Sequence, residues 1–166
     1  MKRGLLPIVA LALGVLTLGV AEAAGPPPIA VDVKGAKHKD GPYLDDSQGV
    51  KIPIGRSKTL YWEVTNNTIS PLDRVFTDAE TSSQDTSGYT IRWFRRKQNI
   101  SPEVKGAGFE FRLQGGATKR FSAKIRHKSA GADHLCVGAQ AEPIPPDTAP
   151  PTDGAFFAIP KLSLCK

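Results

Sequence analysis

Apolar and polar residues alternate along most of this chain, in short runs separated by turn residues. The run 58–65, for example, places Leu60, Trp62 and Val64 on one face and polar residues on the other. A period of two is the pattern of a half-buried β-strand, so each such run predicts a strand. The predicted strands cover residues 29–33, 50–54, 58–65, 74–79, 89–95, 109–113, 120–127, 135–141 and 155–162.

Glycine and asparagine clusters separate these runs about every ten residues, and no later window of a dozen residues has helical spacing. Short strands with such turns predict an all-β fold, an antiparallel β-sandwich of about seven to nine strands. A closed barrel is the alternative, since strand number does not distinguish the two.

The first 23 residues follow a different pattern, that of a secretory signal peptide. Lys2 and Arg3 precede an apolar run over residues 5–20, and Ala21-Glu22-Ala23 forms a small-x-small site. An uncleaved membrane anchor is the alternative, but the apolar run is short for a spanning helix. We therefore expect cleavage between Ala23 and Ala24, a proline-rich lead-in at 24–28, and one domain over 29–166. The expected location is secreted or periplasmic, in the cell envelope, without a transmembrane segment after cleavage.

Export changes how the charge and the cysteines are interpreted. It removes Lys2, Arg3 and Glu22 from 22 basic and 16 acidic residues, leaving 20 and 15, a net charge of +5. This excess suits anionic envelope polymers, and export argues against a nucleic acid as the partner. The only two cysteines, Cys136 and Cys165, are expected to form one disulfide. A metal site with His134 is the alternative, but it lacks a fourth ligand.

The proline-rich segment 143–154 lies between the last two predicted strands and is expected to protrude as a stiff loop. Two sequons, which begin at Asn66 and Asn99, are assigned to turns.

Recognisable catalytic motifs are missing from the sequence. It contains no glycine-rich phosphate loop, no HExxH and no GxSxG. We therefore expect that the protein is not an enzyme, that it binds no cofactor and that it has no catalytic residue. His127 is interpreted as a solvated strand end. Asp45 and Asp46 are adjacent acids that could hold a weak calcium ion, although their spacing is not that of an EF-hand and a turn is the simpler interpretation.

One segment combines basic and aromatic residues. Arg92, Arg95, Arg96 and Lys97 surround Trp93 and Phe94, a composition that could contact a polyanion or a sugar. In the simpler interpretation Trp93 lies in the core, the arginines are solvated, and a charged turn follows the strand.

The central block resembles the immunoglobulin-like repeats of large bacterial extracellular proteins. The matching pieces lie at 64–67, 74–79, 88–94, 99–101, 113–118 and 121–125, and include "GYTIRWF" and "LQGGAT". The resemblance implies a cell-surface β-sandwich without catalytic residues, and it transfers no ligand. The chain departs from that pattern in being a lone domain, in its cysteine pair and in its proline-rich segment.

These patterns together predict a non-catalytic exported module that binds an unknown protein or an anionic envelope polymer, or that has a structural role. A small exported hydrolase or a metal-handling protein, with a site assembled from distant residues, is the alternative.

Overall fold

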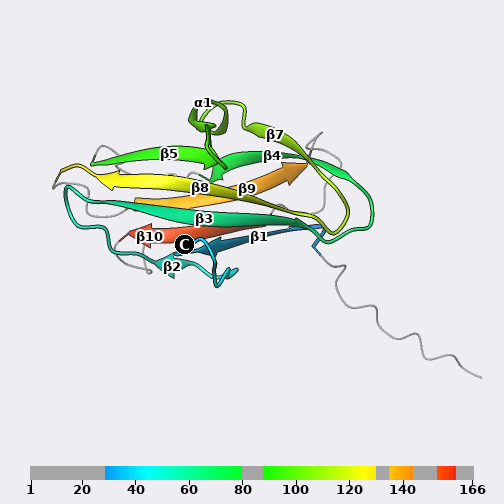
Figure 1. Ribbon diagram of the computed structural model, residues 1–166, viewed down its shortest axis with the longest axis horizontal. Coiled ribbons are helices and arrows are strands. Elements are labelled where there is room, and N and C mark those ends of the chain that lie inside the picture. The colour runs from blue at the N-terminus through cyan, green and yellow to red at the C-terminus, as the bar shows by residue number, and fades with distance from the viewer. Residues whose placement is uncertain (1–28, 80–87, 130–134, 144–152, 160–166) are drawn as a thin grey trace, which may run out of the picture.

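Two five-stranded sheets face each other in the computed structural model, which describes residues 29–79, 88–129, 135–143 and 153–159 (Figure 1). The first sheet has the order β1-β3-β8-β5-β6 and the second the order β2-β10-β9-β4-β7. The strands are β1 (Val31–Ala36), β2 (Gln48–Gly49), β3 (Ser57–Asn66), β4 (Leu72–Ala79), β5 (Tyr89–Arg95), β6 (Gln98–Asn99), β7 (Phe109–Leu113), β8 (Thr118–His127), β9 (Leu135–Pro143) and β10 (Asp153–Ile159). Within this part of the chain, no helix is both long enough and apolar enough to span a membrane.

This architecture confirms the predicted all-β sandwich, with two differences in detail. The described residues form ten strands rather than seven to nine, because β2 and β6 are two-residue strands too short to give a periodic signal. The pairing is also not purely antiparallel, since β2 runs parallel to β10.

The predicted strand at 50–54 is wrong, although its pattern of burial is right. Val50 and Ile52 are 3% and 5% exposed, yet neither lies in a strand. Their backbone groups bind elsewhere: the Val50 N–H donates to the Ala158 carbonyl, and the Ile52 carbonyl is bonded to the His127 ring. Pro53 and a left-handed Gly55 (φ 79°) then turn the chain. The side chains of Val50 and Ile52 therefore pack into the core from a loop.

Aromatic side chains fill the space between the sheets, as the alternation predicts. Trp62 and Trp93 are fully buried with ring centroids 4.9 Å apart, and Phe76 stacks on Phe121 at 4.0 Å. The Trp62 indole N–H donates to the Ala155 carbonyl across the sandwich, at 3.0 Å. Trp93 thus holds β5 against the core and leaves the neighbouring side chains of β5 outside.

A one-turn helix, α1 (Ser101–Val104), was not predicted from the sequence. Pro102 opens it, and Ile100 and Val104 bury their side chains at 0% and 3% exposure. The Ser101 hydroxyl accepts the Trp93 N–H at 2.8 Å. This turn carries the chain from β6 in the first sheet to β7 in the second.

The outer edge of β1 is covered by other parts of the chain. Gly35 exchanges two backbone hydrogen bonds with Leu44, and its carbonyl also accepts the Gln48 amide. The Asp153 carboxylate accepts the Val33 N–H at 2.6 Å, and burial raises the pKa of that carboxyl above its usual value. Most of this edge is therefore closed to another strand.

Several predicted features lie outside the described residues: the signal peptide at 1–23, the lead-in at 24–28, His134 and Cys165. Most of the proline-rich segment does too, but β9 ends at Pro143 and β10 begins at Asp153, so the connection falls where it was expected.

Candidate anion-binding surface

The outer face of the first sheet carries cations from two neighbouring strands. On β8, Lys124 and Arg126 point outward because Ala123 and Ile125 are buried between them. Arg92 on β5 is the direct cross-strand partner of Lys124, and Thr90 is the partner of Arg126. The register of β5 on β8 therefore sets these basic side chains side by side.

These residues line a depression of about 490 Å³, together with Gly55, Ser57 and Thr90. We call its four cations the face cluster: Arg92, Lys124, Arg126 and Lys128. Among the residues that the structure describes, no acidic side chain lines the depression. In the described part of the chain, the ion pairs join Lys34 to Asp32 and Asp45, Arg112 to Asp73, and Arg120 to Glu63. The face cluster therefore lacks an acidic partner there.

The β5–β6 hairpin adds three more cations, which we call the hairpin cluster: Arg95 at the end of β5, and Arg96 and Lys97 after it. Arg95 pairs with Gln98, so only Arg96 and Lys97 form the turn. Arg96 has a φ of 55°, a left-handed conformation that glycine usually supplies in two-residue hairpins. A large charged residue is thus held, with backbone strain, at the tip of the turn.

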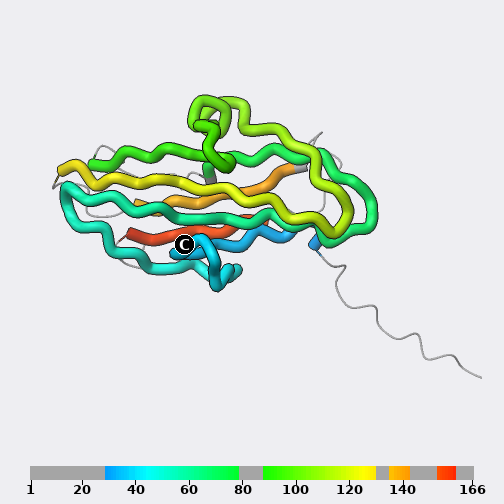
Figure 2. The backbone as a smooth tube through the Cα atoms, viewed as in Figure 1, coloured from blue at the N-terminus to red at the C-terminus, as the bar shows by residue number. Residues whose placement is uncertain are grey.

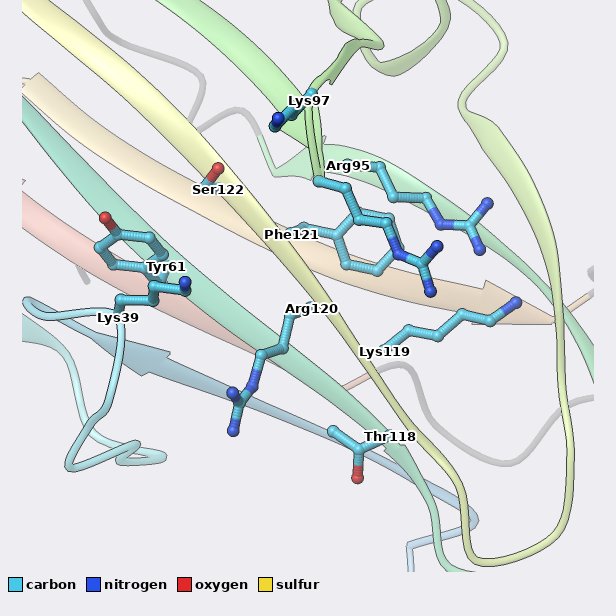
Figure 3. Close-up of a pocket in the computed structure, with 10 residues that line it drawn as sticks. Lys39, Tyr61, Arg95, Lys97, Thr118, Lys119, Arg120, Phe121 and Ser122 are labelled. Carbon is cyan, nitrogen blue, oxygen red and sulfur yellow. The ribbon is translucent and has the colours of Figure 1, made fainter.

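A second depression, of about 640 Å³, lies beside this turn (Figure 3). Its basic residues are the hairpin cluster with Lys39, Lys119 and Arg120, and no acidic residue in the described part of the chain lines it. Figure 3 shows Arg95 and Lys119 on the same side of β8, with the Phe121 ring beside them.

Aromatic rings contact two of these cations. The Lys119 ammonium lies 5.2 Å from the Phe111 ring centroid, and the Arg95 guanidinium lies 5.6 Å from that of Phe109. Partial burial, with Arg95 and Arg96 nearby, lowers the pKa of Lys119 from its usual value. The second depression therefore combines positive charge with an apolar wall.

The adjacent acids Asp45 and Asp46 are both exposed, and Asp45 lies 3.5 Å from the Lys34 ammonium. Within the described residues, no group of three His, Cys, Asp or Glu side chains could hold a metal ion. The suggested calcium contact therefore gains no third ligand from this part of the chain.

The interpretation of His127 as a solvated strand end is wrong. Its ring stacks on Tyr89 with centroids 4.4 Å apart, and Nδ1 lies 2.9 Å from the Ile52 carbonyl oxygen, so Nδ1 is the donor. Nε2 is buried, and no described residue forms a hydrogen bond with it. The ring is a packing element between β8 and the 50–55 loop.

The structure brings the four predicted contact residues to one surface but divides them. Arg92 lies in the face cluster, whereas Arg95, Arg96 and Lys97 line the depression beside the turn. Six further cations were not singled out from the sequence: Lys39, Lys119, Arg120, Lys124, Arg126 and Lys128. The alternation of β8 already placed Lys124 and Arg126 on its outer face; only the pairing of β8 with β5 places them beside Arg92.

Comparison with known proteins adds only distant similarities. No protein-family model matches the chain, and no curated protein matches it in sequence. The N-terminal domain of PorA superposes with a TM-score of 0.44 at 11% identity, over 77% of this chain and 96% of that one. The major pilin subunit BcpA of Bacillus cereus gives 0.44 at 9% identity, over 79% and 40%. A family 123 glycoside hydrolase from Clostridium perfringens gives 0.42 at 10%, over 78% and 27%. All three TM-scores lie below 0.5, so no function is carried over from these proteins.

Proposed function

We propose that this protein is an exported, non-catalytic binding module that holds an anionic polymer of the cell envelope on the outer face of its first sheet. The face cluster and the hairpin cluster supply the contacts. The lead observation is the like-charged pair Arg92 and Lys124. They are direct cross-strand neighbours, and no acidic side chain of the described residues lies in the depression that they line. Like charges in this position destabilise a sheet, so their presence favours an external anion as their partner.

We propose further that the domain is immunoglobulin-like, that it is exported and that it contains one disulfide. The order of the seven longest strands supports an immunoglobulin-like fold: β1-β3-β8-β5 in one sheet and β10-β9-β4 in the other correspond to the A-B-E-D and G-F-C strands of that fold. The signal-like pattern of residues 1–23 supports export. We also propose a disulfide between Cys136 and Cys165. Two observations support it: Cys136 carries no free thiol, and Cys165 is the only other cysteine in the sequence.

Binding to sodium polyphosphate and to uncharged dextran tests the proposal. Polyphosphate should bind at low ionic strength and weaken by at least about tenfold between roughly 0.05 and 0.5 M salt, because salt screens exposed charges. Dextran should not bind. Absent or salt-insensitive polyphosphate binding would reject the anionic-polymer function.

A matched pair of double variants locates the site. Lys124→Glu with Arg126→Glu should abolish polyphosphate binding, because it reverses two charges of the face cluster. Lys51→Glu with Lys105→Glu makes the same change in net charge at two exposed lysines outside both depressions, and should retain binding. Equal loss in both variants would mean that only net charge matters and that the face is not the site.

A further inference from the structure

The pairing of β8 is incomplete on one side. Along β3, β8 is paired from Thr118 to Arg126, but along β5 its register ends where Ser122 meets Phe94. Beyond that point β5 turns into the β5–β6 hairpin, and Figures 1 and 2 show β8 continuing well past the end of β5. Residues 118–121, which we call the edge segment, therefore have a strand on one side only among the described residues.

The backbone of β8 shows which groups face this open side. The His127 N–H and carbonyl bond to Arg56 and Gly55, and the Ala117 carbonyl accepts the Asn66 N–H, so odd-numbered positions face β3. The Lys128 N–H instead donates to Gly88, just before β5, so even-numbered positions face the β5 side. Successive residues of a strand alternate in this way. Thr118 and Arg120 therefore present their N–H and carbonyl groups toward the open side.

The surroundings of the edge segment define what could pair there. Phe121, in contact with Phe109 and Phe111, provides an apolar wall on the inner side. The hairpin cluster and Lys119 surround it with positive charge, and the described residues place no acid in the lining of the depression. The opposite edge of this sheet, β1, is capped by its own chain, through Leu44, Gln48 and Asp153. Natural sheets usually cover such edges, so an edge that no described residue covers, beside a charged depression, favours a partner strand.

We propose that the edge segment of β8 binds an extended acidic segment of another protein, which adds a short strand to the first sheet in line with β5. Backbone hydrogen bonds to Thr118 and Arg120 fix the strand. Apolar side chains of the segment lie toward Phe121, and its carboxylates lie among the hairpin cluster. This site shares the hairpin cluster with the polymer-binding surface, but it needs neither Lys124 nor Arg126.

Peptides that differ only in backbone hydrogen bonding give the direct test. The probe is a peptide of about seven residues that alternates glutamate and valine, with its binding measured by fluorescence anisotropy. Only one set of alternate amides faces β8, so N-methylation of that set should weaken binding by about tenfold or more, and methylation of the other set should not. A peptide of the same composition with its glutamates and valines in two blocks should bind more weakly. Equal binding of all these peptides would overturn the proposal.

Two readouts on the protein locate the strand. On peptide binding, the amides of Thr118 and Arg120 should exchange with solvent more slowly, whereas those of Lys119 and Phe121, which face β3, should change little. Arg120→Pro removes the N–H on the open side, and Arg120→Ala removes the same charge but keeps that N–H. Arg120→Pro should therefore bind the peptide more weakly than Arg120→Ala. If Arg120→Pro does not fold, the exchange pattern and the methylated peptides decide the question.

The outcomes also separate this inference from the proposed function. Discrimination between the methylated peptides together with failure of polyphosphate to bind would reject the polymer-binding function and leave the strand site standing. Salt-sensitive polyphosphate binding, with equal binding of the two methylated peptides, would reject the strand site and support the polymer-binding function.

Discussion

Asn66 shows how one side chain organises an end of the sandwich. It is fully buried at the end of β3, and its amide nitrogen donates to the carbonyls of Ser70, Leu113 and Gln114. Its amide oxygen accepts the backbone N–H and the hydroxyl of Thr68. Asn66 thereby joins the β3–β4 loop to the β7–β8 turn. Asn66 is the last residue of β3, so only Asn67 and Thr68 of the first sequon lie beyond the strand, where a turn was predicted. A glycan on the Asn66 nitrogen would break the network.

Replacing Asn66 by alanine should therefore destabilise the protein strongly. The change removes a donor from three buried or half-buried carbonyls and the acceptor of the Thr68 N–H, although the Ser70 carbonyl keeps the Thr68 hydroxyl and the Gln114 carbonyl keeps the Ala117 N–H. We expect this loss to lower the free energy of unfolding by about 2–4 kcal/mol. Asn67→Ala is the matched control, because Asn67 is exposed and its amide donates one bond, to Ile29; its cost should be below about 1 kcal/mol. Urea denaturation of both variants measures the difference, and equal midpoints would contradict this account of Asn66.

The β5–β6 hairpin is an element in which stability and binding oppose each other. Arg96 occupies a left-handed conformation at its tip, where glycine would cost less. Arg96→Gly should stabilise the protein by about 1 kcal/mol, a rise in Tm of roughly 2–4 °C. The same change should weaken polyphosphate binding several-fold, because it removes one cation of the hairpin cluster.

Calorimetry and polyphosphate titration of Arg96→Gly check both effects, with Lys97→Gly as the control for charge loss alone. Lys97 is not at a positive φ, so its replacement should weaken binding without raising Tm. A lower Tm for Arg96→Gly than for the native protein would show that the turn is not strained.

Strands with alternating apolar and polar residues could be predicted from the sequence. Elements whose conformation depends on contacts with residues distant in sequence, or that are shorter than one period, could not. In β3 and β8 the apolar residues fall on one face over a whole strand, so position and orientation were both predicted correctly. The 50–54 run has the same alternation, but its backbone bonds to Ala158 and His127, which are distant in sequence. The helix α1 is a single turn, too short to give a helical period.

The candidate surface was predictable to a similar extent. Local composition identified Arg92, Arg95, Arg96 and Lys97, because basic and aromatic residues adjoin within one run. The face cluster could not be assembled this way, because the pairing of Arg92 with Lys124 joins residues 32 positions apart. The open edge of β8 could not be predicted from the sequence either, because it depends on the residue at which β5 stops pairing with β8.

At the scale of the whole molecule, we expect the stability of β9 and β10 to depend on a covalent link between β9 and the residues after β10. β10 is an interior strand of the second sheet, between β2 and β9, and its Phe157 lies fully buried against Trp62. Cys136 on β9 is paired with Ala158 on β10, and both are buried apart from the main core. A bond from Cys136 to Cys165 would close a loop of about 30 residues that contains all of β10 and the connection before it.

Closing that loop should stabilise the protein by about 3–4 kcal/mol, because the cross-link restricts the unfolded chain. We therefore expect reductant to lower the Tm of the exported protein by roughly 6–16 °C. Cys165→Ser should have the lower Tm from the start and should not respond to reductant, which separates loss of the bond from other effects of the reagent. Peptide mapping without reduction should recover Cys136 and Cys165 in one cross-linked fragment. Two titratable thiols in native exported protein, with equal Tm for both forms, would show instead that packing of β10 alone holds this end of the sandwich.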